Sequence, residues 1–198
     1  MLPVATLFNP TSFLQKRTDE ERPSAKAPEK QQQKVSQDSG LIEQYTFQSF
    51  VVGRNNEFAH AACSYVAECP NRAQYSPLFI CGPNGMGKTH LMHAIGHYIK
   101  NQSPNVKLRN VSGERFLNEC ISGIRRNQMN AFRGRYREQC DVLLMDDIQI
   151  LGRGEAVQEE FFHTLNHFSE NGKLIVVTSD TSPGKIRGLE NRIRSRLE

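Results

Sequence analysis

The segment from Gly82 to Thr89 fits the pattern Gly-x-x-x-x-Gly-Lys-Thr at every fixed position. Its glycines, Gly82, Gly85 and Gly87, let the backbone wrap around a phosphate so that successive N–H groups point inward. A helix that follows such a loop presents its positive end to the same anion. Lys88 would place a charge at the β- and γ-phosphates, and Thr89 would offer a hydroxyl to Mg²⁺. The pattern predicts a nucleoside triphosphate site; a glycine-rich turn that caps a helix is the alternative.

Two acidic residues follow a second apolar run. Residues 142–145 are Val-Leu-Leu-Met, and Asp146 and Asp147 come directly after them. In open parallel sheets, ligands bind at the carboxyl ends of the strands. We therefore expect Asp146 to hold Mg²⁺, directly or through water, and Asp147 to orient the water that attacks the γ-phosphate. Two acids after a strand can also cap a helix, but a phosphate-binding loop upstream favours the catalytic interpretation.

A third polar strand end completes the predicted chemistry. The apolar residues 174–177 are followed by Thr178, Ser179 and Asp180. Polar groups in such a position can sense the γ-phosphate or hold the attacking water, and Asp180 is the candidate for this role. A polar turn leading to Pro183 is the alternative.

Alternating strands and helices must position these groups. Short apolar runs separated by segments with helical spacing indicate a parallel sheet covered on both faces. The fold class predicted is therefore α/β, a three-layer P-loop NTPase. We expect strands at residues 78–81, 106–111, 142–145 and 174–177, and helices at residues 89–100, 114–124, 128–137 and 157–168.

Composition excludes several classes of protein. With 37% hydrophobic residues and 11 Phe among 198 residues, the chain can fill a core, so full disorder is excluded. No run of 18 apolar residues exists, so no membrane span is expected, and no secretory signal is visible at the N-terminus. Five scattered cysteines without a CxxC pair favour a reducing cytoplasm.

The N-terminal region differs from the rest. Eleven of the 26 residues at 15–40 are charged and none is aromatic, so this stretch cannot bury enough surface to offset its chain entropy. We expect residues 1–43 to be a disordered linker or the remnant of a preceding region, and residues 44–198 to form the ATPase core.

The motifs resemble those of bacterial chromosomal replication initiators of the DnaA family, which are AAA+ ATPases. The resemblance covers about Tyr45 to Glu198. Beyond the phosphate-binding loop, it rests on residues 46–53, 58–62, 87–96, 146–149, 158–164 and 189–196.

The resemblance implies roles that the spacing alone does not. Arg196 would be an arginine finger that reaches the γ-phosphate of ATP on the next subunit, and Arg192 would lie in the same inter-subunit contact. A planar cation supplied in trans stabilises phosphate oxygens only after assembly. Four positions would line the adenine pocket: Phe47, Phe50, Val51 and Asn56. Core packing is the alternative for the two phenylalanines.

A basic segment lies between the second predicted strand and Asp146. Residues 107–137 hold eight basic and two acidic side chains, a net charge of +6 in a chain whose total is +4. Such a patch suits a polyanion, although a solvated helix face has the same composition. The resemblance implies an initiator-specific pair of helices that grips single-stranded DNA. The contacts expected are Ile121, Arg115, Arg125, Arg126 and, after the acidic pair, Arg153.

The resemblance also implies elements beyond Glu198: a further strand beside the P-loop strand, a helical lid and a domain that reads duplex DNA. We therefore expect a truncated core with an exposed sheet edge and weak ATP turnover. The function predicted is an ATP-switched initiator that binds ATP and Mg²⁺, assembles with itself on origin DNA and contacts a replicative helicase or its loader. A helicase-loader-like or short regulatory relative is the alternative, whereas a metabolic kinase would need an acceptor pocket for which no signature is present.

Overall fold

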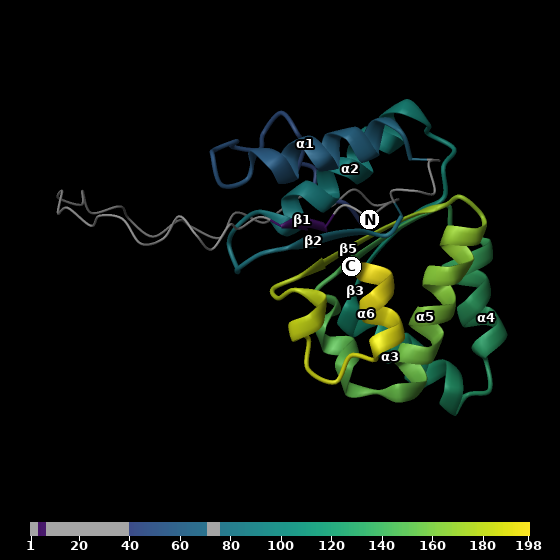
Figure 1. The fold of residues 1–198 in the computed structure, drawn as a ribbon. Helices are drawn as coiled ribbons and strands as arrows, with labels where there is room; N and C mark the ends of the chain where they lie inside the picture. The colour runs from purple at the N-terminus through teal and green to yellow at the C-terminus, as the bar shows by residue number, and fades with distance from the viewer. Residues whose placement is uncertain (1–3, 7–39, 71–75) are drawn as a thin grey trace, which may run out of the picture.

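The computed structural model describes residues 4–6, 40–70 and 76–198. Five parallel strands form one sheet in the order β1-β2-β5-β4-β3 (Figure 1). They are β1 (Val4–Thr6), β2 (Leu78–Cys81), β3 (Leu108–Ser112), β4 (Val142–Asp146) and β5 (Leu174–Ser179). The four strands predicted from sequence are thus confirmed, with small shifts at their ends.

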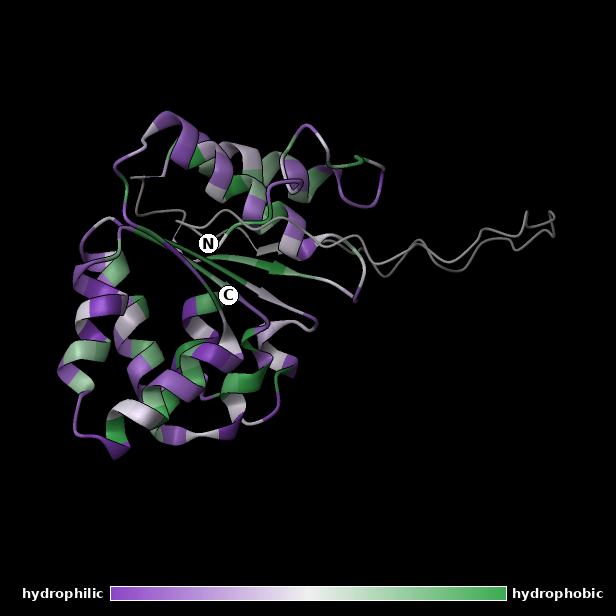
Figure 2. Ribbon diagram, turned by 180° about the vertical axis from the view of Figure 1, so that it is seen from behind, coloured by the Kyte–Doolittle hydropathy of each residue, from purple (hydrophilic) through white to green (hydrophobic). Residues whose placement is uncertain are grey.

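Helices cover both faces of this sheet, as expected. On one face lie α1 (Glu57–Glu68) and α2 (Lys88–Gln102). The other face carries α3 (Gly113–Arg125), α4 (Met129–Arg133), α5 (Glu155–Glu170) and α6 (Asn191–Leu197). Viewed from behind, the hydrophobic strands run between the two helical layers (Figure 2). The three-layer α/β class predicted from the apolar runs is confirmed.

Alternate residues of the strands fill two separate cores. Leu78, Ile80 and Leu144 belong to the cluster shared with α1 and α2. Their neighbours Phe79 and Leu143 belong to the cluster shared with α3, α5 and α6. Successive strand side chains point to opposite faces, and here both faces are apolar because both are covered.

The single helix predicted at residues 128–137 is shorter than expected. α4 ends at Arg133, and a π-helical turn, Gly134–Glu138, continues from it. Phe132 and Tyr136 are both fully buried against Phe116, with ring centroids 5.1 and 4.9 Å away. The chain therefore keeps both aromatic rings in the core while its backbone passes from an α-helical to a wider π-helical turn.

The sequence does not predict two of the helices, α1 and α6. α1 buries mainly small residues, Ala59, Cys63 and Ala67, together with Val66. α6 lies within a segment dominated by arginines, and only Ile193 and Leu197 are buried.

The N-terminal boundary also differs from the expectation. Leu41 is 1% exposed and belongs to the α1–α2 core, so the folded part includes residues that the sequence assigns to the linker. The β2 edge, which the sequence predicts to be unpaired, carries β1 in parallel register, with Val4 beside Phe79 and Thr6 beside Cys81. Most of the predicted linker, residues 1–3 and 7–39, lies outside the described part of the chain.

Within that described part, none of the helices combines the length and the apolar character that a bilayer crossing requires.

Candidate nucleotide site

The phosphate-binding loop joins β2 to α2. Gly85 and Gly87 have φ values of 81° and 88°, in the left-handed region that favours glycine. A Cβ at Gly87 would lie only 2.6 Å from Cε2 of Phe50, so any other residue there would displace the ring of Phe50. Lys88 is 6% exposed, and its ammonium group donates to the carbonyl of Pro83 over 3.2 Å. The lysine therefore curls over the loop, as a phosphate-binding lysine must.

The loop is tied directly to the acidic strand end. The hydroxyl of Thr89 donates to Asp146 Oδ2 over 2.8 Å, and the hydroxyl of Thr178 donates to Asp146 Oδ1. Parallel pairing of β4 with β5 places Met145 beside Val177, so the residues that follow them meet. The two predicted Mg²⁺ ligands, Thr89 and Asp146, are thus brought together.

Thr178 is a site residue that the sequence reasoning missed. Besides its contact with Asp146, its Oγ1 accepts the backbone N–H of Asp147 over 3.0 Å. It therefore orients both acids of the pair. Its position at the end of an apolar strand is a signal that the sequence does contain. The sequence prediction, however, assigns the sensor role at this strand end to Asp180, two residues later.

These donors fit Mg²⁺. A carboxylate and a hydroxyl are hard oxygen ligands, and Mg²⁺ commonly takes only one or two protein ligands and completes its shell with water and phosphate oxygens. Among the described residues, no group of three or more His, Cys, Asp or Glu could hold a metal ion. Thr89 and Asp146, whose oxygens lie 2.8 Å apart, are the candidate ligands in the part of the chain that the structure describes.

Asp147 is held in an uncommon conformation. Its φ is 57°, and it is one of two non-glycine residues with positive φ in the described segments. Gln149 Nε2 donates to its Oδ1 over 3.1 Å. Backbone conformations of this kind persist where the surroundings fix them, often at functional sites. The strained backbone and the hydrogen bond from Gln149 fix the direction of the Asp147 carboxylate.

A cavity of about 310 Å³ lies over these groups. The phosphate-binding loop, Asp147, Tyr45 and His90 line it. The rings of Tyr45 and His90 stack with centroids 4.7 Å apart, and His90 Nε2 donates to the carbonyl of Thr46 over 2.8 Å. The sequence predicts a role for neither residue, because Tyr45 precedes the phosphate-binding loop by 37 positions and only the fold brings it to His90.

The four expected adenine-pocket residues lie in the segment before α1. Phe47 and Phe50 are half-buried against the α1–α2 core, and Phe50 stacks on His60 with centroids 5.7 Å apart. Asn56 accepts from the N–H of Gly53 over 2.7 Å and donates to the carbonyl of Val51 over 3.1 Å. The side chain of Val51 is 84% exposed. Asn56 therefore closes the loop that precedes α1, and this loop leaves Val51 and the neighbouring Val52 exposed.

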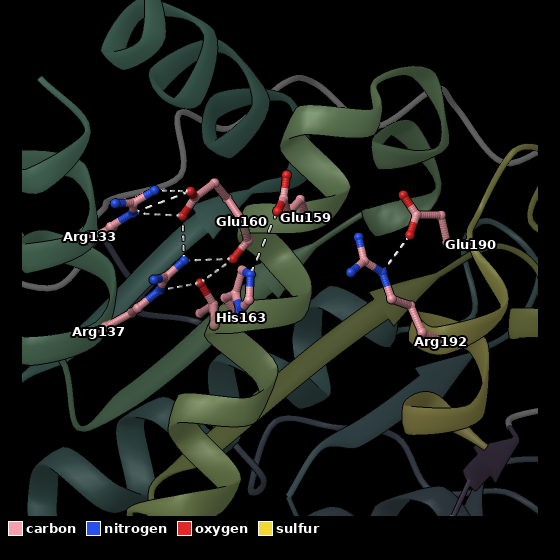
Figure 3. Close-up of polar contacts among 8 residues, drawn as sticks. Arg133, Arg137, Glu159, Glu160, His163, Glu190 and Arg192 are labelled. Atoms are coloured by element: carbon pink, nitrogen blue, oxygen red, sulfur yellow. Dashed lines mark hydrogen bonds and ion pairs between the residues drawn. The ribbon is translucent and has the colours of Figure 1, made fainter. Parts of the chain in front are cut away.

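The arginines expected at a subunit contact lie on the sheet face opposite α2. Arg192 Nε donates to Glu190 Oε2 over 2.5 Å (Figure 3). The guanidinium of Arg192 also lies 4.7 Å from the ring centroid of Phe162. Arg196 Nε donates to Asn166 Oδ1 over 3.2 Å and is exposed. Neither side chain lines the phosphate cavity of its own chain.

Comparison with known proteins assigns the chain. A family model described as the bacterial DnaA ATPase domain matches residues 41–198. The chain belongs to the bacterial DnaA family. It is 55% identical over 158 residues to the chromosomal replication initiator protein DnaA of Bdellovibrio bacteriovorus, covering 80% of this chain and 34% of that protein. This DnaA-family chain thus spans about a third of the length of that curated relative.

Solved DnaA structures agree with the fold. Domain III of the Thermotoga maritima replication initiation protein DnaA matches with a TM-score of 0.77 and 42% identity, covering 80% of this chain and 65% of that one. A replication initiator DnaA bound to AMPPCP and single-stranded DNA matches with a TM-score of 0.74 and 33% identity, covering 79% of this chain and 48% of that one. The DnaC helicase loader, at 17% identity and a TM-score of 0.61, shares the fold alone.

In this DnaA-family chain, much of the positive charge of the basic segment is paired internally. Arg133 Nη2 lies 2.6 Å from Glu160 Oε1, and Arg137 contacts the other carboxylate oxygen (Figure 3). Burial would raise the pKa of Glu160, but hydrogen bonds from both arginines outweigh it and lower that pKa. The net charge of +6 therefore overstates the free charge, because Glu160 comes from α5, outside the segment that was counted.

A second acid, which is already included in the net charge of +6, pairs with two more arginines of the segment. Glu119 contacts Arg115 at 2.8 Å and Arg135 at 3.5 Å, and it accepts the hydroxyl of Tyr136 over 3.0 Å. Arg125 and Arg126, at the end of α3, are exposed. Of the arginines predicted to contact DNA from this DnaA segment, Arg115 is held by an acid and the other two face solvent.

The apolar DNA contact expected at Ile121 is half-buried. It packs against the core beneath α3, whereas Ile124, one turn later, is 47% exposed. In this DnaA-family chain, Ile124 is thus the more accessible apolar side chain at the end of α3.

Asp180 lies apart from the phosphate cavity. It lines a second cavity together with Gln149, Arg153, Lys185 and Arg187. Asp180 and Arg153, predicted as a sensor and a DNA contact, therefore share one site.

Proposed function

We propose that this chain is the ATP-binding module of a cytoplasmic chromosomal replication initiator that binds ATP together with Mg²⁺. The observation that carries the proposal is the hydrogen bond from Thr89 to Asp146, which joins the phosphate-binding loop to the acidic strand end beneath one cavity. The AMPPCP-bound DnaA of Aquifex aeolicus, 34% identical over 79% of this chain, supports an adenine nucleotide as the ligand.

In this proposal each group has one task. Lys88 and the loop amides hold the phosphates, and the adenine lies near Phe47, Phe50, Val51 and Asn56. Thr89 and Asp146 would hold Mg²⁺, which would supply positive charge to the phosphate oxygens. Asp147 orients the attacking water, with Thr178 and Gln149 holding it in place. Asp180, at the end of β5, would act as a sensor only through the adjacent turn, because it lines a different cavity.

Hydrolysis requires a second copy of the chain. Arg192 and Arg196 lie on α6, on the sheet face away from α2, so an arginine finger would have to act on the nucleotide of a neighbouring subunit. This dependence supports a slow ATPase that serves as a switch, with ATP favouring an oligomer on origin DNA. Single-stranded DNA would contact Arg125, Arg126 and Ile121, and a replicative helicase or its loader would bind the assembly.

Nucleotide binding is tested by titrating a fluorescent ATP analogue into the 198-residue chain. Lys88→Ala removes the charge that faces the phosphates and should weaken binding at least a hundredfold. Lys107→Ala, which removes an exposed lysine at the amino end of β3, is the matched control and should bind like the unchanged chain. Equal binding by Lys88→Ala and Lys107→Ala would contradict the proposed site.

Assembly is tested by sedimentation with single-stranded DNA in ATP and in ADP. Larger complexes are expected in ATP than in ADP, and Arg196→Ala should remove that difference without changing ATP affinity. Identical sedimentation in both nucleotides would contradict the switch.

A further inference from the structure

The segment that precedes α1 begins on α2 and ends at the phosphate-binding loop; we call residues 40–50 the strap. Its first turn is anchored by packing, because Leu41 is 1% exposed and a Cβ on Gly96 of α2 would lie 3.0 Å from Leu41 Cδ1. Its last residue, Phe50, places its ring against Gly87 of the phosphate-binding loop. The strap therefore runs along α2 from the middle of that helix to the nucleotide site.

Two histidines of α2 bond to the backbone of the strap. His93 Nδ1 accepts the N–H of Ile42 over 2.9 Å, and His97 Nε2 donates to the carbonyl of Ile42 over 2.8 Å. An amide N–H can only donate and a carbonyl can only accept, so Nδ1 of His93 carries no proton and Nε2 of His97 carries one. Both backbone polar groups of Ile42 are thus held by imidazoles one helical turn apart.

Ile42 in turn fixes the aromatic ring that lines the nucleotide cavity. The N–H of Tyr45 donates to the carbonyl of Ile42 over 3.0 Å, so that oxygen accepts from both Tyr45 and His97. The ring of Tyr45 lies edge-on to His93, with centroids 5.7 Å apart, and lines the cavity beside Lys88. Two histidines that do not line the cavity are therefore connected to it through a single turn of the strap.

The groups around His93 favour its neutral ring. His93 is 4% exposed, and burial, with smaller contributions from His97 and His90, lowers its pKa to about 4. β3 faces it with the uncharged Asn110, and the one charged residue of the strap, Glu43, is exposed. At neutral pH the ring therefore offers Nδ1 as the acceptor that the strap requires.

We propose that the strap is a lid over the bound nucleotide, and that His93 and His97 are positioning residues that hold this lid shut through Ile42. Tyr45 contacts the nucleotide directly, and the nucleotide leaves only when the strap comes off α2. The proposal rests on the proposed function and adds to it a control over how long the nucleotide stays bound.

The test measures how fast a fluorescent ATP analogue leaves the 198-residue chain when excess unlabelled ATP is added in a stopped-flow instrument. The net contribution of one hydrogen bond corresponds to about two- to tenfold in an equilibrium constant. His97→Leu removes the donor to Ile42, so strap opening, and with it the release rate, should rise by about two- to tenfold. His97→Gln is similar in size to His97→Leu but keeps an N–H donor, and it should restore slow release.

Two strap variants complete the series. Tyr45→Ala removes the ring that lines the cavity and should release the analogue several-fold faster than the unchanged chain. Gln44→Ala, which truncates the exposed neighbouring side chain, is the matched control and should release it at the unchanged rate. Equal release rates for Tyr45→Ala and Gln44→Ala would overturn the contact between Tyr45 and the nucleotide.

The release rate separates positioning from stability alone. A chain that is only destabilised contains fewer folded molecules and gives a smaller binding amplitude, but each folded molecule releases the analogue at the unchanged rate. A smaller amplitude with an unchanged rate in His97→Leu, or equally fast release from His97→Leu and His97→Gln, would overturn the positioning role and leave the proposed function standing. If the unchanged chain does not bind the analogue, the proposed function fails and this proposal fails with it.

A second readout follows the strap itself. The chain contains no tryptophan, so Tyr45→Trp introduces a single fluorescent reporter at the cavity. Its emission should change when ATP binds, and adding His97→Leu should shift the emission of the nucleotide-free chain toward that of an indole in water. A Tyr45→Trp variant that binds the analogue without any change in emission would show that the strap does not cover the nucleotide.

Discussion

The ring of Phe50 lies where a side chain on Gly87 would have to go: a Cβ at Gly87 would be 2.6 Å from Phe50 Cε2. Phe50 precedes the phosphate-binding loop by more than thirty residues, and its ring also contacts His90 with centroids 5.1 Å apart. The segment before α1 is therefore packed directly onto the loop that holds the phosphates. A nucleotide whose adenine contacts that segment and whose phosphates contact the loop would bind across this junction.

This junction predicts the effect of Gly87→Ala. The substitution places a Cβ in the left-handed region and against Phe50. The free energy of unfolding should therefore fall by about 1–3 kcal/mol, and ATP affinity should fall as well. Gly53→Ala is the matched control, because no atom lies within 4 Å of its Cβ and its φ is not positive. Thermal unfolding and ATP titration measure both effects. A Gly87→Ala variant as stable as Gly53→Ala would mean that the ring moves aside freely.

Asp146→Asn should remove the Mg²⁺ dependence of nucleotide binding. Asp146 accepts the hydroxyls of Thr89 and Thr178, and an amide in its place keeps the shape but loses the charge that a divalent cation requires. Titrations with Mg²⁺ and with EDTA should then give the same affinity, whereas the unchanged chain should bind more weakly in EDTA. Asp141→Asn, at the other end of the same strand, should keep the difference. Retention of the Mg²⁺ effect in Asp146→Asn would exclude Asp146 as a ligand.

Glu160→Gln should be strongly destabilising. The Glu160 side chain is 9% exposed and contacts Arg133 and Arg137, so the substitution leaves the mostly buried Arg137 without its counter-charge. A loss of about 3 kcal/mol is expected in chemical denaturation. Glu159→Gln, one residue earlier and 61% exposed, should change stability by less than about 0.5 kcal/mol. Equal stabilities of these two variants would show that the ion pairs contribute nothing.

The carboxylate of Glu160 also predicts part of the loss of stability of the folded chain at acidic pH. The pKa of Glu160 is lowered in the folded state because the hydrogen bonds from its two arginines outweigh the effect of burial. Its contribution is therefore present above the ordinary glutamate pKa of about 4.3 and disappears as pH falls through the lower, folded value. Stability of the unchanged chain should fall more steeply below about pH 4 than that of Glu160→Gln.

The buried His93 predicts a second pH range, less acidic than the first, in which the stability of the folded chain changes. Burial, with smaller contributions from His97 and His90, lowers its pKa to about 4, and its Nδ1 accepts the N–H of Ile42 over 2.9 Å. An unfolded histidine titrates near 6.5, so the unfolded state takes up the proton first as pH falls. Stability should drop by up to about 1.4 kcal/mol per pH unit between about 6.5 and 4.

The variant His93→Gln should lose this pH dependence, although it also loses stability at neutral pH. His163→Gln, whose side chain is 51% exposed, should keep the dependence of the unchanged chain. Denaturation curves at about pH 4.5, 5.5 and 6.5 span the window and give the comparison. A His93→Gln variant with an unaltered pH profile would assign the dependence to another group.

The sequence predicted best what depends on short, contiguous patterns. Lys88, Thr89 and Asp146 were identified because loop, helix start and strand end are each marked by adjacent residues, and the structure brings these three together. It predicted less well what depends on pairing between distant segments. Glu160 neutralises arginines more than twenty residues away, and the charge count over residues 107–137 does not include it. Thr178 was overlooked in favour of Asp180, because only the β4–β5 register shows which residue meets Asp146.

The pairing of β1 with β2 has a consequence for the order of folding. Val4 pairs with Phe79, which follows 75 positions later in the chain, so β1 can dock only after β2 has been made and placed. Closing a loop of this length costs chain entropy, and only three residue pairs are formed to offset that cost. The amide protons of β1 should therefore exchange with solvent far sooner than those of β4 and β5. Whenever β1 detaches, β2 presents a free edge that can accept the same three residues from another copy of the chain.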